Sequence, residues 1–484
     1  MFLTSTLFII VTLGGLFGKS VLSQTLNDPD GLVNLRNLAK ETERTAADKS
    51  IPIVFVPGFS GWGAPLFGAL NYFGGVIDIP NLLADMGYTV IVAPVAPIST
   101  NWERACELYR QLTFGNTTGR RRAIQFSNSP DFRNWKWDRD RKVHFVCHSQ
   151  GGNTVRYLIS LMANGAGTLH PTYFAEAGRD DWIISVTTLG TPHRGTTIIN
   201  ALESFLSRSR QQAVGLVARL FATASFYPPE KRAYDLQLDH WGIRRNSGET
   251  FQGMLARMES VNGSVSKWLN SSNNGLYDNS IEGVHNLSLK AINTSENIYY
   301  FSLSFHATDP FPEAWPEWGR DAIDSFPTNI ESFRSFVEWV TKAVITRVLQ
   351  ELGYDLALPN PGRYIPRKDV IPILLPSVYA MGSQELTQVQ RDILGPNLGD
   401  WYQNDGIVNT ESMSGPDNFV RGINSLPDLN FSVDGKRGIY WHLGVNDQMD
   451  HADQIGVFIE QSTGNLMKEM YLNIANLISR LPVH

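Results

Sequence analysis

The sequence predicts an α/β fold in which a mostly parallel central sheet is flanked by helices. Two observations favour this class: short apolar β-type runs alternate with helical runs, and several of those strands end at a glycine or proline turn. The composition agrees, because 42% of the 484 residues are hydrophobic and 18% are charged, as in ordinary globular chains.

The strands and helices can be placed along the chain in order. Strands are predicted at residues 51–56, 89–93, 143–147, 182–189, 299–304 and 438–442. Helices are predicted at residues 79–86, 102–112 and 151–162. The polar residues 24–50 are expected to form a short lead-in, and the charged residues 115–141 a solvated loop.

Two segments fall outside this alternation. Residues 196–226 carry spaced apolar positions and predict an amphipathic lid, in one or two pieces. Residues of about 306–400 include a long helical run at 330–352 between proline-rich stretches, and they predict an inserted cap.

Charge and cysteine content exclude several classes of protein. A net charge of −6 argues against a nucleic-acid binder, which would need a basic face. Only Cys106 and Cys147 occur, which excludes a disulfide-stapled scaffold and a multi-cysteine zinc module. Cys147 lies in an apolar strand, where a thiol is expected to be inert.

The N-terminus predicts a secreted, extracellular protein. Residues 1–23 have an apolar run followed by small residues, typical of a signal peptide cleaved after Ser23. The alternative is an uncleaved membrane anchor. The mature chain would span residues 24–484. Sequons predict a glycoprotein and favour a eukaryotic secretory route; they occur at Asn116, Asn262, Asn270, Asn286, Asn293 and Asn430.

The turn at Ser149 has the features of a nucleophile elbow. A predicted strand runs directly into His-Ser-Gln-Gly-Gly at 148–152 and then into a helix. Gly151 supplies the small residue that the sharp turn needs, and Cys147 replaces the glycine usual on the other side. The alternative is a serine that merely caps a helix.

The glycine-rich loop after the first strand is a candidate oxyanion hole. Residues 57–63 read Pro-Gly-Phe-Ser-Gly-Trp-Gly, and glycines let the backbone approach a substrate. We expect the backbone N–H groups of Phe59 and of Gln150 to donate to the oxyanion. The alternative is an ordinary glycine-rich turn at the end of a strand.

The base and the acid are expected late in the chain, because this fold places them after the serine. His451 follows the last strand in a polar segment, whereas His442 falls inside that strand and is expected to be structural. Asp405 occupies an Asn-Asp-Gly turn and is the candidate acid. Other acids remain open: Asp309, Asp324 and Asp355.

Together these motifs resemble the secreted lipases of the thermophilic-bacillus and staphylococcal type. The matching segments are residues 57–63, 99–107, 148–152, 186–196, 234–242, 404–410 and 449–451. The resemblance implies an α/β-hydrolase fold and the triad Ser149, Asp405 and His451. It also implies triacylglycerol hydrolysis at a lipid–water interface beneath a mobile lid, with no organic cofactor and no stable protein partner. Two alternatives stay open: a short-chain carboxylesterase or phospholipase, and a hydrolase-fold binding protein without activity.

The chain departs from this family at its metal positions. The family binds zinc through two aspartates and two histidines, but Glu103 stands at the first aspartate and no histidine occurs between Cys106 and His144. Asp239 matches the last zinc aspartate. The family's calcium carboxylates map to Asp453 and to a phenylalanine, Phe458. We therefore expect no bound metal.

Overall fold

The computed structural model describes most of the chain. The described residues are 30–63, 70–115, 123–129, 132, 135–167, 171–201, 210–232, 234–310, 363–367, 369–371, 374–396, 398–423, 431, 435–457 and 461–483. Several predicted features lie outside them: the signal peptide at 1–23, the helical run at 330–352, Asp324, Asp355, Phe458 and the sequons at Asn116 and Asn430.

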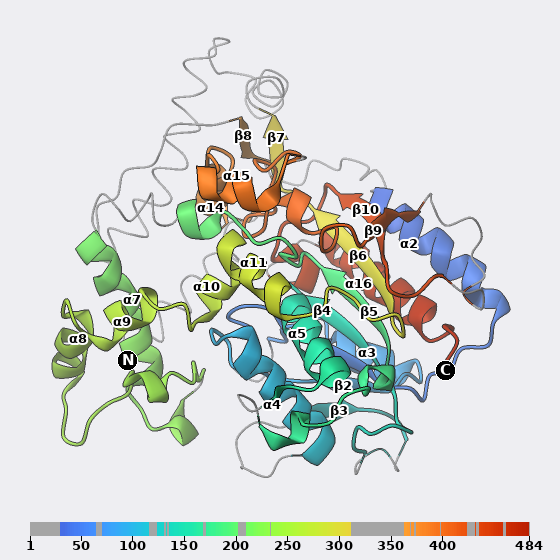
Figure 1. Ribbon diagram of the computed structural model, residues 1–484, viewed down its shortest axis with the longest axis horizontal. Helices are drawn as coiled ribbons and strands as arrows, with labels where there is room; N and C mark the ends of the chain where they lie inside the picture. Colours follow the sequence, from blue (N-terminus) through green and yellow to red (C-terminus); the bar gives the residue numbers. More distant parts are fainter. Residues whose placement is uncertain are drawn as a thin grey trace.

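An eight-stranded sheet of order β3-β2-β1-β4-β5-β6-β10-β9 forms the centre of the molecule (Figure 1). Its strands are β1 (Ile53–Val56), β2 (Val90–Val92), β3 (Ile124–Phe126), β4 (Val143–His148), β5 (Ile183–Leu189), β6 (Tyr299–Phe305), β9 (Val420–Gly422) and β10 (Tyr440–Asn446). Among the described strands of this sheet, only β3 pairs in the antiparallel sense. The predicted mostly parallel sheet is therefore confirmed, with two short edge strands, β3 and β9, that the sequence analysis missed.

The sheet is covered by helices on both faces. The four central strands β1, β4, β5 and β6 are buried at every residue, as expected for parallel strands between two helical layers. One apolar core joins the sheet to α2 (Asp30–Glu41), α3 (Ile79–Asp85) and α16 (Gln461–Ile478). A second core joins it to α4 (Asn101–Phe114) and α5 (Gln150–Asn164).

Two expectations for the N-terminal half were wrong. Residues 30–41 form helix α2 rather than a polar lead-in, because Leu32, Leu35 and Leu38 bury one face of the helix in the core. The segment 115–141 contains β3 as well as exposed turns, and Trp137 within it is only 1% exposed. Trp137 packs edge-on against Phe145 and Trp182, which ties this segment to the sheet.

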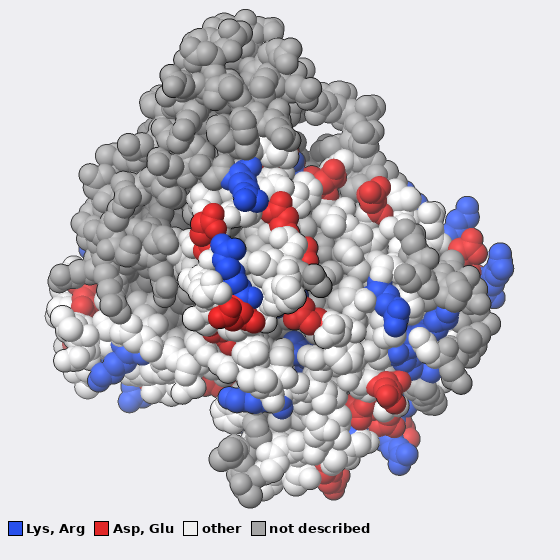
Figure 2. Space-filling view, turned by 45° about the horizontal axis from the view of Figure 1, so that its top comes forward, with Lys and Arg blue, Asp and Glu red and all other residues white. Residues whose placement is uncertain are grey.

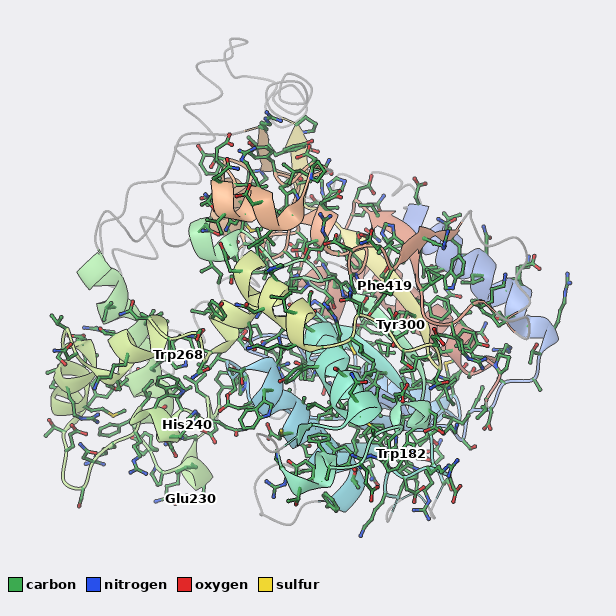
Figure 3. The ribbon with its side chains drawn as sticks, viewed as in Figure 1. Trp182, Glu230, His240, Trp268, Tyr300 and Phe419 are labelled. Carbon is green, nitrogen blue, oxygen red and sulfur yellow. The ribbon has the colours of Figure 1, made fainter. Side chains whose placement is uncertain are left out.

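A separate group of helices follows β5 in the chain. These are α7 (Arg210–Ser225), α8 (Phe251–Glu259), α9 (Ser264–Leu269), α10 (Gly275–Asn279) and α11 (Ile281–Lys290). Helices α7, α8 and α9 share their own apolar core, in which Phe221 meets Trp268 edge-to-face at 5.1 Å. Figure 3 shows Trp268 among these helices, well apart from Tyr300 and Trp182 in the sheet region. The sequence analysis expected only the first part of this group, as the lid at 196–226.

The described part of the predicted cap at 306–400 is small. It contains a two-stranded antiparallel sheet, β7 (Thr308–Pro310) with β8 (Tyr364–Pro366), and the helices α14 (Leu375–Met381) and α15 (Gln388–Leu394). Within the described ranges, no helix is both long and apolar enough to cross a bilayer. On the face shown in Figure 2, acidic and basic side chains are interspersed.

Candidate active site

Ser149 lies at a strained turn between β4 and α5. Its φ of 55° and ψ of −131° place a non-glycine residue in a region that costs energy and is found at functional sites. The turn leaves no space around it, since a Cβ on Gly151 would lie 2.5 Å from the carbonyl oxygen of Val56. The Ser149 amide donates to Leu189 O at 2.9 Å, which fixes the serine to the neighbouring strand.

The loop after β1 lies directly against Ser149. A Cβ on Gly58 would come within 2.5 Å of the Ser149 Cβ, so only glycine permits this approach. The amide of Gly58 donates to the Tyr72 hydroxyl at 2.9 Å, and the amide of Ser60 donates to Pro97 O at 2.7 Å.

The two amides expected to form the oxyanion hole are Phe59 and Gln150. Among the described residues, neither amide donates to a protein acceptor, whereas the amides that flank Phe59 are both engaged. Gln150 is the first residue of α5, where the helix dipole favours negative charge. Two backbone N–H groups near Ser149 are thus free to donate to a ligand oxygen.

Arg104 of α4 holds this loop in place. Its side chain is fully buried, and its guanidinium donates to the carbonyl oxygens of Pro57, Gly58 and Ala96. Its Nε donates to the hydroxyl of Thr154 at 2.9 Å. The sequence analysis missed this role, because nothing local distinguishes Arg104 from an exposed helical arginine.

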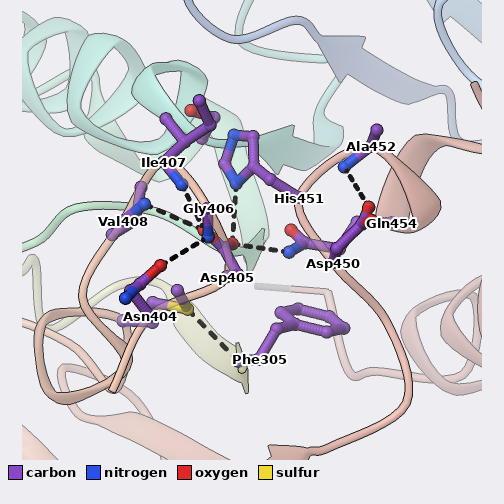
Figure 4. Close-up of polar contacts among 12 residues, drawn as sticks. Phe305, Asn404, Asp405, Gly406, Ile407, Val408, Asp450, His451, Ala452 and Gln454 are labelled. Carbon is purple, nitrogen blue, oxygen red and sulfur yellow. Dashed lines mark hydrogen bonds and ion pairs between the residues drawn. The ribbon is translucent and has the colours of Figure 1, made fainter. Parts of the chain in front are cut away.

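Asp405 and His451 form a buried hydrogen-bonded pair (Figure 4). His451 Nδ1 lies 2.7 Å from Asp405 Oδ2, and the His451 amide donates to Asp405 O at 2.9 Å. The other carboxylate oxygen, Oδ1, accepts from the amides of Ile407 at 3.0 Å and Val408 at 2.8 Å. The Asn-Asp-Gly turn therefore aims one oxygen at the imidazole while its own backbone holds the other.

The residue before Ser149 connects this pair to the serine turn. The rings of His148 and His451 lie 4.5 Å apart between centroids. His148 Nε2 lies 3.2 Å from Gln454 Oε1, and Gln454 Nε2 donates to Asp405 Oδ2 at 2.7 Å. The sequence analysis assigned no role to His148 or Gln454. Asp405, His451 and the Ser149 turn thus belong to one buried cluster.

Other candidate residues have structural surroundings. His442 Nε2 lies 2.9 Å from the Ser304 hydroxyl, and burial lowers the pKa of His442 to about 4. Asp309 pairs with Ile365 in the small β7–β8 sheet. Cys106 and Cys147 are both free and buried, and burial raises the pKa of Cys106 to about 11 and that of Cys147 well above its ordinary value. Neither thiol is a reactive nucleophile at neutral pH.

The carboxylates at the family's zinc position bind other protein groups. Asp239 Oδ1 accepts from Arg232 at 2.8 Å, and Arg232 also pairs with Asp235 at 2.7 Å. Glu103 accepts from the Thr100 amide in a capping box and lies 3.4 Å from His240. Because Glu103 and Asp239 are already engaged by protein groups, they do not fit a zinc site.

The calcium position is likewise occupied by protein contacts. Asp450 Oδ2 accepts from the Ile371 amide at 3.0 Å, Asp453 Oδ2 accepts from the Asp450 amide at 3.1 Å, and the charge of Arg367 acts on both carboxyls. Within the described residues, no three His, Cys, Asp or Glu side chains group as a metal site would require.

The parallel sheet and the serine turn define an α/β-hydrolase-like fold. Residues 49–312 match the family described as "Lipase-like, C-terminal domain". Because that match covers more than half of the chain, the chain belongs to this lipase-like family.

Named relatives agree with this assignment, and solved structures agree with the fold. "Lipase" of Staphylococcus epidermidis is 27% identical over 55% of this chain and 40% of its own, and "Lipase 2" of Staphylococcus aureus is 25% identical over 89% and 54%. The chain thus spans about half the length of the curated relatives it matches. Among solved structures, EstA of Clostridium botulinum has a TM-score of 0.61 at 23% identity, covering 95% of this chain and 100% of its own. Staphylococcus hyicus lipase has a TM-score of 0.57 at 22% identity, covering 90% and 96%. These relatives are bacterial and do not support the expected eukaryotic origin.

Proposed function

We propose that this protein is a serine ester hydrolase that cleaves triacylglycerol, with Ser149 as nucleophile, His451 as base and Asp405 as the orienting acid. The observation that carries the proposal is the 2.7 Å bond between His451 Nδ1 and Asp405 Oδ2 in the same buried cluster as the strained Ser149 turn. A carboxylate on Nδ1 leaves Nε2 as the basic nitrogen, which is the tautomer that a general base needs.

The mechanism proceeds through an acyl-enzyme. His451 Nε2 takes the hydroxyl proton of Ser149 as Ser149 attacks the ester carbonyl, and the protonated imidazole then gives that proton to the leaving alcohol. Asp405 stabilises the imidazolium. The amides of Phe59 and Gln150 bind the oxyanion, and loss of one such donor typically lowers the rate about 100- to 1000-fold. Water activated by His451 then hydrolyses the acyl-enzyme.

The surroundings of Phe59 support an apolar acyl chain as the substrate group. Phe59 and Ile98 pack against the apolar core of α7, α8 and α9, so the oxyanion loop adjoins a helical group rich in hydrophobic side chains. The hydroxyl of Tyr234 also donates to Ser60 O at 2.6 Å. In this proposal the segment 196–226 serves as the lid over the acyl chain and opens at a lipid–water interface.

The decisive experiment compares the wild-type protein with Ser149→Ala on triacylglycerols of increasing chain length. Hydrolysis of long-chain emulsions is expected for the wild type, and its loss is expected in the variant while the thermal midpoint is kept. A covalent organophosphate adduct at Ser149 provides a readout that needs no substrate. Activity confined to short, soluble esters would assign a carboxylesterase, and activity on phospholipids a phospholipase. If the wild-type protein reacted with neither esters nor organophosphates, the remaining assignment would be a hydrolase-fold binding protein without activity.

Secretion is part of the same proposal. The apolar run at 1–23 supports export of the chain, and an enzyme acting on triacylglycerol must reach a lipid surface. N-terminal sequencing of the exported protein is expected to begin at Gln24, and retention of residues 1–23 would indicate an anchor instead.

A further inference from the structure

A chain of buried hydrogen bonds runs from the oxyanion loop to the Asp405 carboxylate. The Gly58 amide donates to the Tyr72 hydroxyl at 2.9 Å, which lies 2.7 Å from His148 Nδ1. His148 Nε2 lies 3.2 Å from Gln454 Oε1, and Gln454 Nε2 donates to Asp405 Oδ2 at 2.7 Å. The proposed mechanism uses both ends of this chain but none of its three inner side chains.

The direction of every bond in the chain follows from its ends. The Asp405 carboxylate can only accept, so Gln454 presents its amide nitrogen to Asp405 and its oxygen to His148. That oxygen can only accept, so His148 carries its proton on Nε2 and a lone pair on Nδ1. Tyr72 must then donate to Nδ1, which leaves its oxygen to accept the Gly58 amide. One tautomer of a neutral His148 therefore satisfies all four bonds.

The surroundings keep His148 neutral. Exposure is 5% for Tyr72, 1% for His148 and 0% for Gln454. Burial, followed by the charge of His451, lowers the pKa of His148 well below its usual range, against hydrogen bonds from Gln454 and the His451 backbone. Burial, partly offset by the Gly58 amide and the charge of Arg104, raises the pKa of Tyr72.

Neighbouring residues are shaped to admit Gln454. A Cβ on Gly190, whose φ is +57°, would lie 2.2 Å from Gln454 Oε1, so the turn after β5 leaves this space by lacking a side chain. The Tyr471 hydroxyl donates to Gln454 O at 2.9 Å, which anchors the backbone beneath. Gly190 therefore leaves room for the side-chain amide of Gln454, and Tyr471 anchors the backbone that carries it.

We infer that Tyr72, His148 and Gln454 form a positioning relay that couples the oxyanion loop to the Asp405–His451 pair. Gln454 fixes the orientation of Asp405 Oδ2, and Tyr72 fixes the amide of Gly58, next to the oxyanion donor Phe59. His148 joins Tyr72 to Gln454, so a displacement of the oxyanion loop changes the position of Asp405, and the reverse also holds. This inference rests on the proposed function, because positioning has an effect on rate only if Ser149 and His451 carry out catalysis.

The relay can be tested with Gln454→Met, which keeps volume but removes both bonds, and with Tyr72→Phe, which removes one hydroxyl. Each variant is expected to lower kcat on the order of 10-fold, which is within the range of one intramolecular hydrogen bond, while KM stays unchanged because neither side chain contacts substrate in the proposed mechanism. The double variant is expected to lose no more than the worse single variant, because both changes break the same relay.

The matched control is Tyr300→Phe. Tyr300 is also buried, and its hydroxyl likewise accepts a backbone amide, that of Ser295 at 2.9 Å. Loss of the Tyr300 hydroxyl is expected to lower stability without changing kcat. In the double variant with Gln454→Met, the two losses of stability are expected to add, and kcat is expected to equal that of Gln454→Met alone. Losses in kcat that simply multiply in the Tyr72 and Gln454 double variant would overturn the relay.

A second readout needs no activity. In ¹⁵N-histidine spectra of Ser149→Ala, His148 is expected to show a proton on Nε2 and a bare Nδ1. Gln454→Met in that background removes the acceptor that holds this proton and is expected to mix the two tautomers, whereas Tyr72→Phe is expected to keep the proton on Nε2. A fixed opposite tautomer would overturn the relay. If the wild-type protein neither hydrolyses esters nor reacts with organophosphates, the proposed function falls and the positioning role falls with it. An active wild type with unchanged kcat in both relay variants overturns the relay alone.

Discussion

Two sets of carboxylates in this protein have opposite kinds of partner. Asp405 directs one oxygen at an imidazole, and its other oxygen is held by two backbone amides. At the positions where related lipases are expected to bind metals, Asp239 pairs with Arg232 and Asp453 faces the charge of Arg367. A dication can be replaced by a guanidinium where the need is structural, but no arginine could serve as a proton acceptor in place of an imidazole.

The difference separates carboxylates that take part in the proposed reaction from carboxylates that stabilise the surrounding loops. Arg367 donates from Nε and Nη2 to Asp369 at 2.6 and 2.9 Å and from Nη1 to His306 O at 2.6 Å. It thereby joins the segment after β8 to the end of β6, while Ile371 bonds to Asp450 beside His451. A permanent protein cation thus supports the loop that carries the proposed base.

The largest expected effect comes from Asp405→Asn, which breaks the first side of the comparison. The amides of Ile407 and Val408 would hold the carbonyl oxygen of the new side chain, so its NH₂ group would face His451 Nδ1. That forces the proton of His451 onto Nε2. Because Nε2 can then no longer accept the hydroxyl proton of Ser149, kcat is expected to fall on the order of 10⁴-fold. Ester hydrolysis under saturating substrate measures it.

Asp140→Asn is the control for this change, because Asp140 is exposed in a turn between β3 and β4. It is expected to keep wild-type kcat. If Asp405→Asn kept more than a tenth of the wild-type rate, Asp405 would not be the acid of the site.

The residues that sequence reasoning could find share a local signal. Ser149 follows a strand and precedes glycines, and Asp405 lies in an Asn-Asp-Gly turn, so each is marked by its immediate neighbours. The structure brings Asp405 and His451 together across 46 positions of sequence. Gln454 had no such mark, because its partner His148 lies 306 positions away and a glutamine near a helical turn is commonplace.

The same reasoning explains the fold. The buried central strands were predicted because parallel strands read as continuous apolar runs, whereas β3 and β9 have three residues each, too few for a periodic pattern. Helices α8, α10 and α11 were missed although Thr250, Asn274 and Ser280 cap their N-termini. Those caps were the available signal. Helix α2 was missed because its charged residues obscured a row of three leucines.

The next largest effect is expected for Arg367→Met. Removing the guanidinium breaks its pair with Asp369 and takes away a positive charge that acts on the buried carboxyls of Asp450 and Asp453, whose pKa values burial already raises. Because one of the two buried carboxyls can take up a proton, the loss should be about 3 kcal/mol, the lower end for leaving a buried charge uncompensated. The free energy of unfolding in urea measures it.

Arg232→Met is the comparison variant. The side chains of Asp235 and Asp239 remain 23% and 35% exposed, so water can solvate them, and a loss of about 1–2 kcal/mol is expected. An equal or larger loss in Arg232→Met would contradict the ranking, which rests on the buried carboxyls of Asp450 and Asp453 on which the Arg367 charge acts.

A smaller, pH-dependent effect is expected for Asp278, which lies beside the N-terminus of α4. Burial raises the pKa of Asp278 to about 6, opposed by the Asn101 amide and reinforced by the charge of Glu103. Because the folded pKa exceeds the unfolded value, the ionised carboxyl destabilises the fold above pH 6, and this cost disappears as the pH falls from 6 toward 4.

Asp278→Asn is therefore expected to stabilise the protein at pH 8 by on the order of 1–3 kcal/mol and to have little effect at pH 4.5, since the amide oxygen can still accept from Asn101. Urea unfolding at the two pH values measures the difference. A gain that is the same at both values would place its origin elsewhere than in ionisation.

The smallest expected effect is that of a chelator. It tests whether Arg232 and Arg367 take the place of a metal ion. If the positive charges of Arg232 and Arg367 take the place of a metal beside these carboxylates, EDTA should change neither the thermal midpoint nor kcat, and added Zn²⁺ or Ca²⁺ should not raise the midpoint. Arg367→Met sharpens this test, because it frees Asp450 and Asp453 in a buried site. Recovery of its stability on addition of Ca²⁺, with no such response in the wild type, would show that guanidinium and dication are exchangeable at this position. A wild-type protein that loses stability in EDTA would instead mean that a cation binds alongside the arginines, and the contrast between the two sets of carboxylates would not hold.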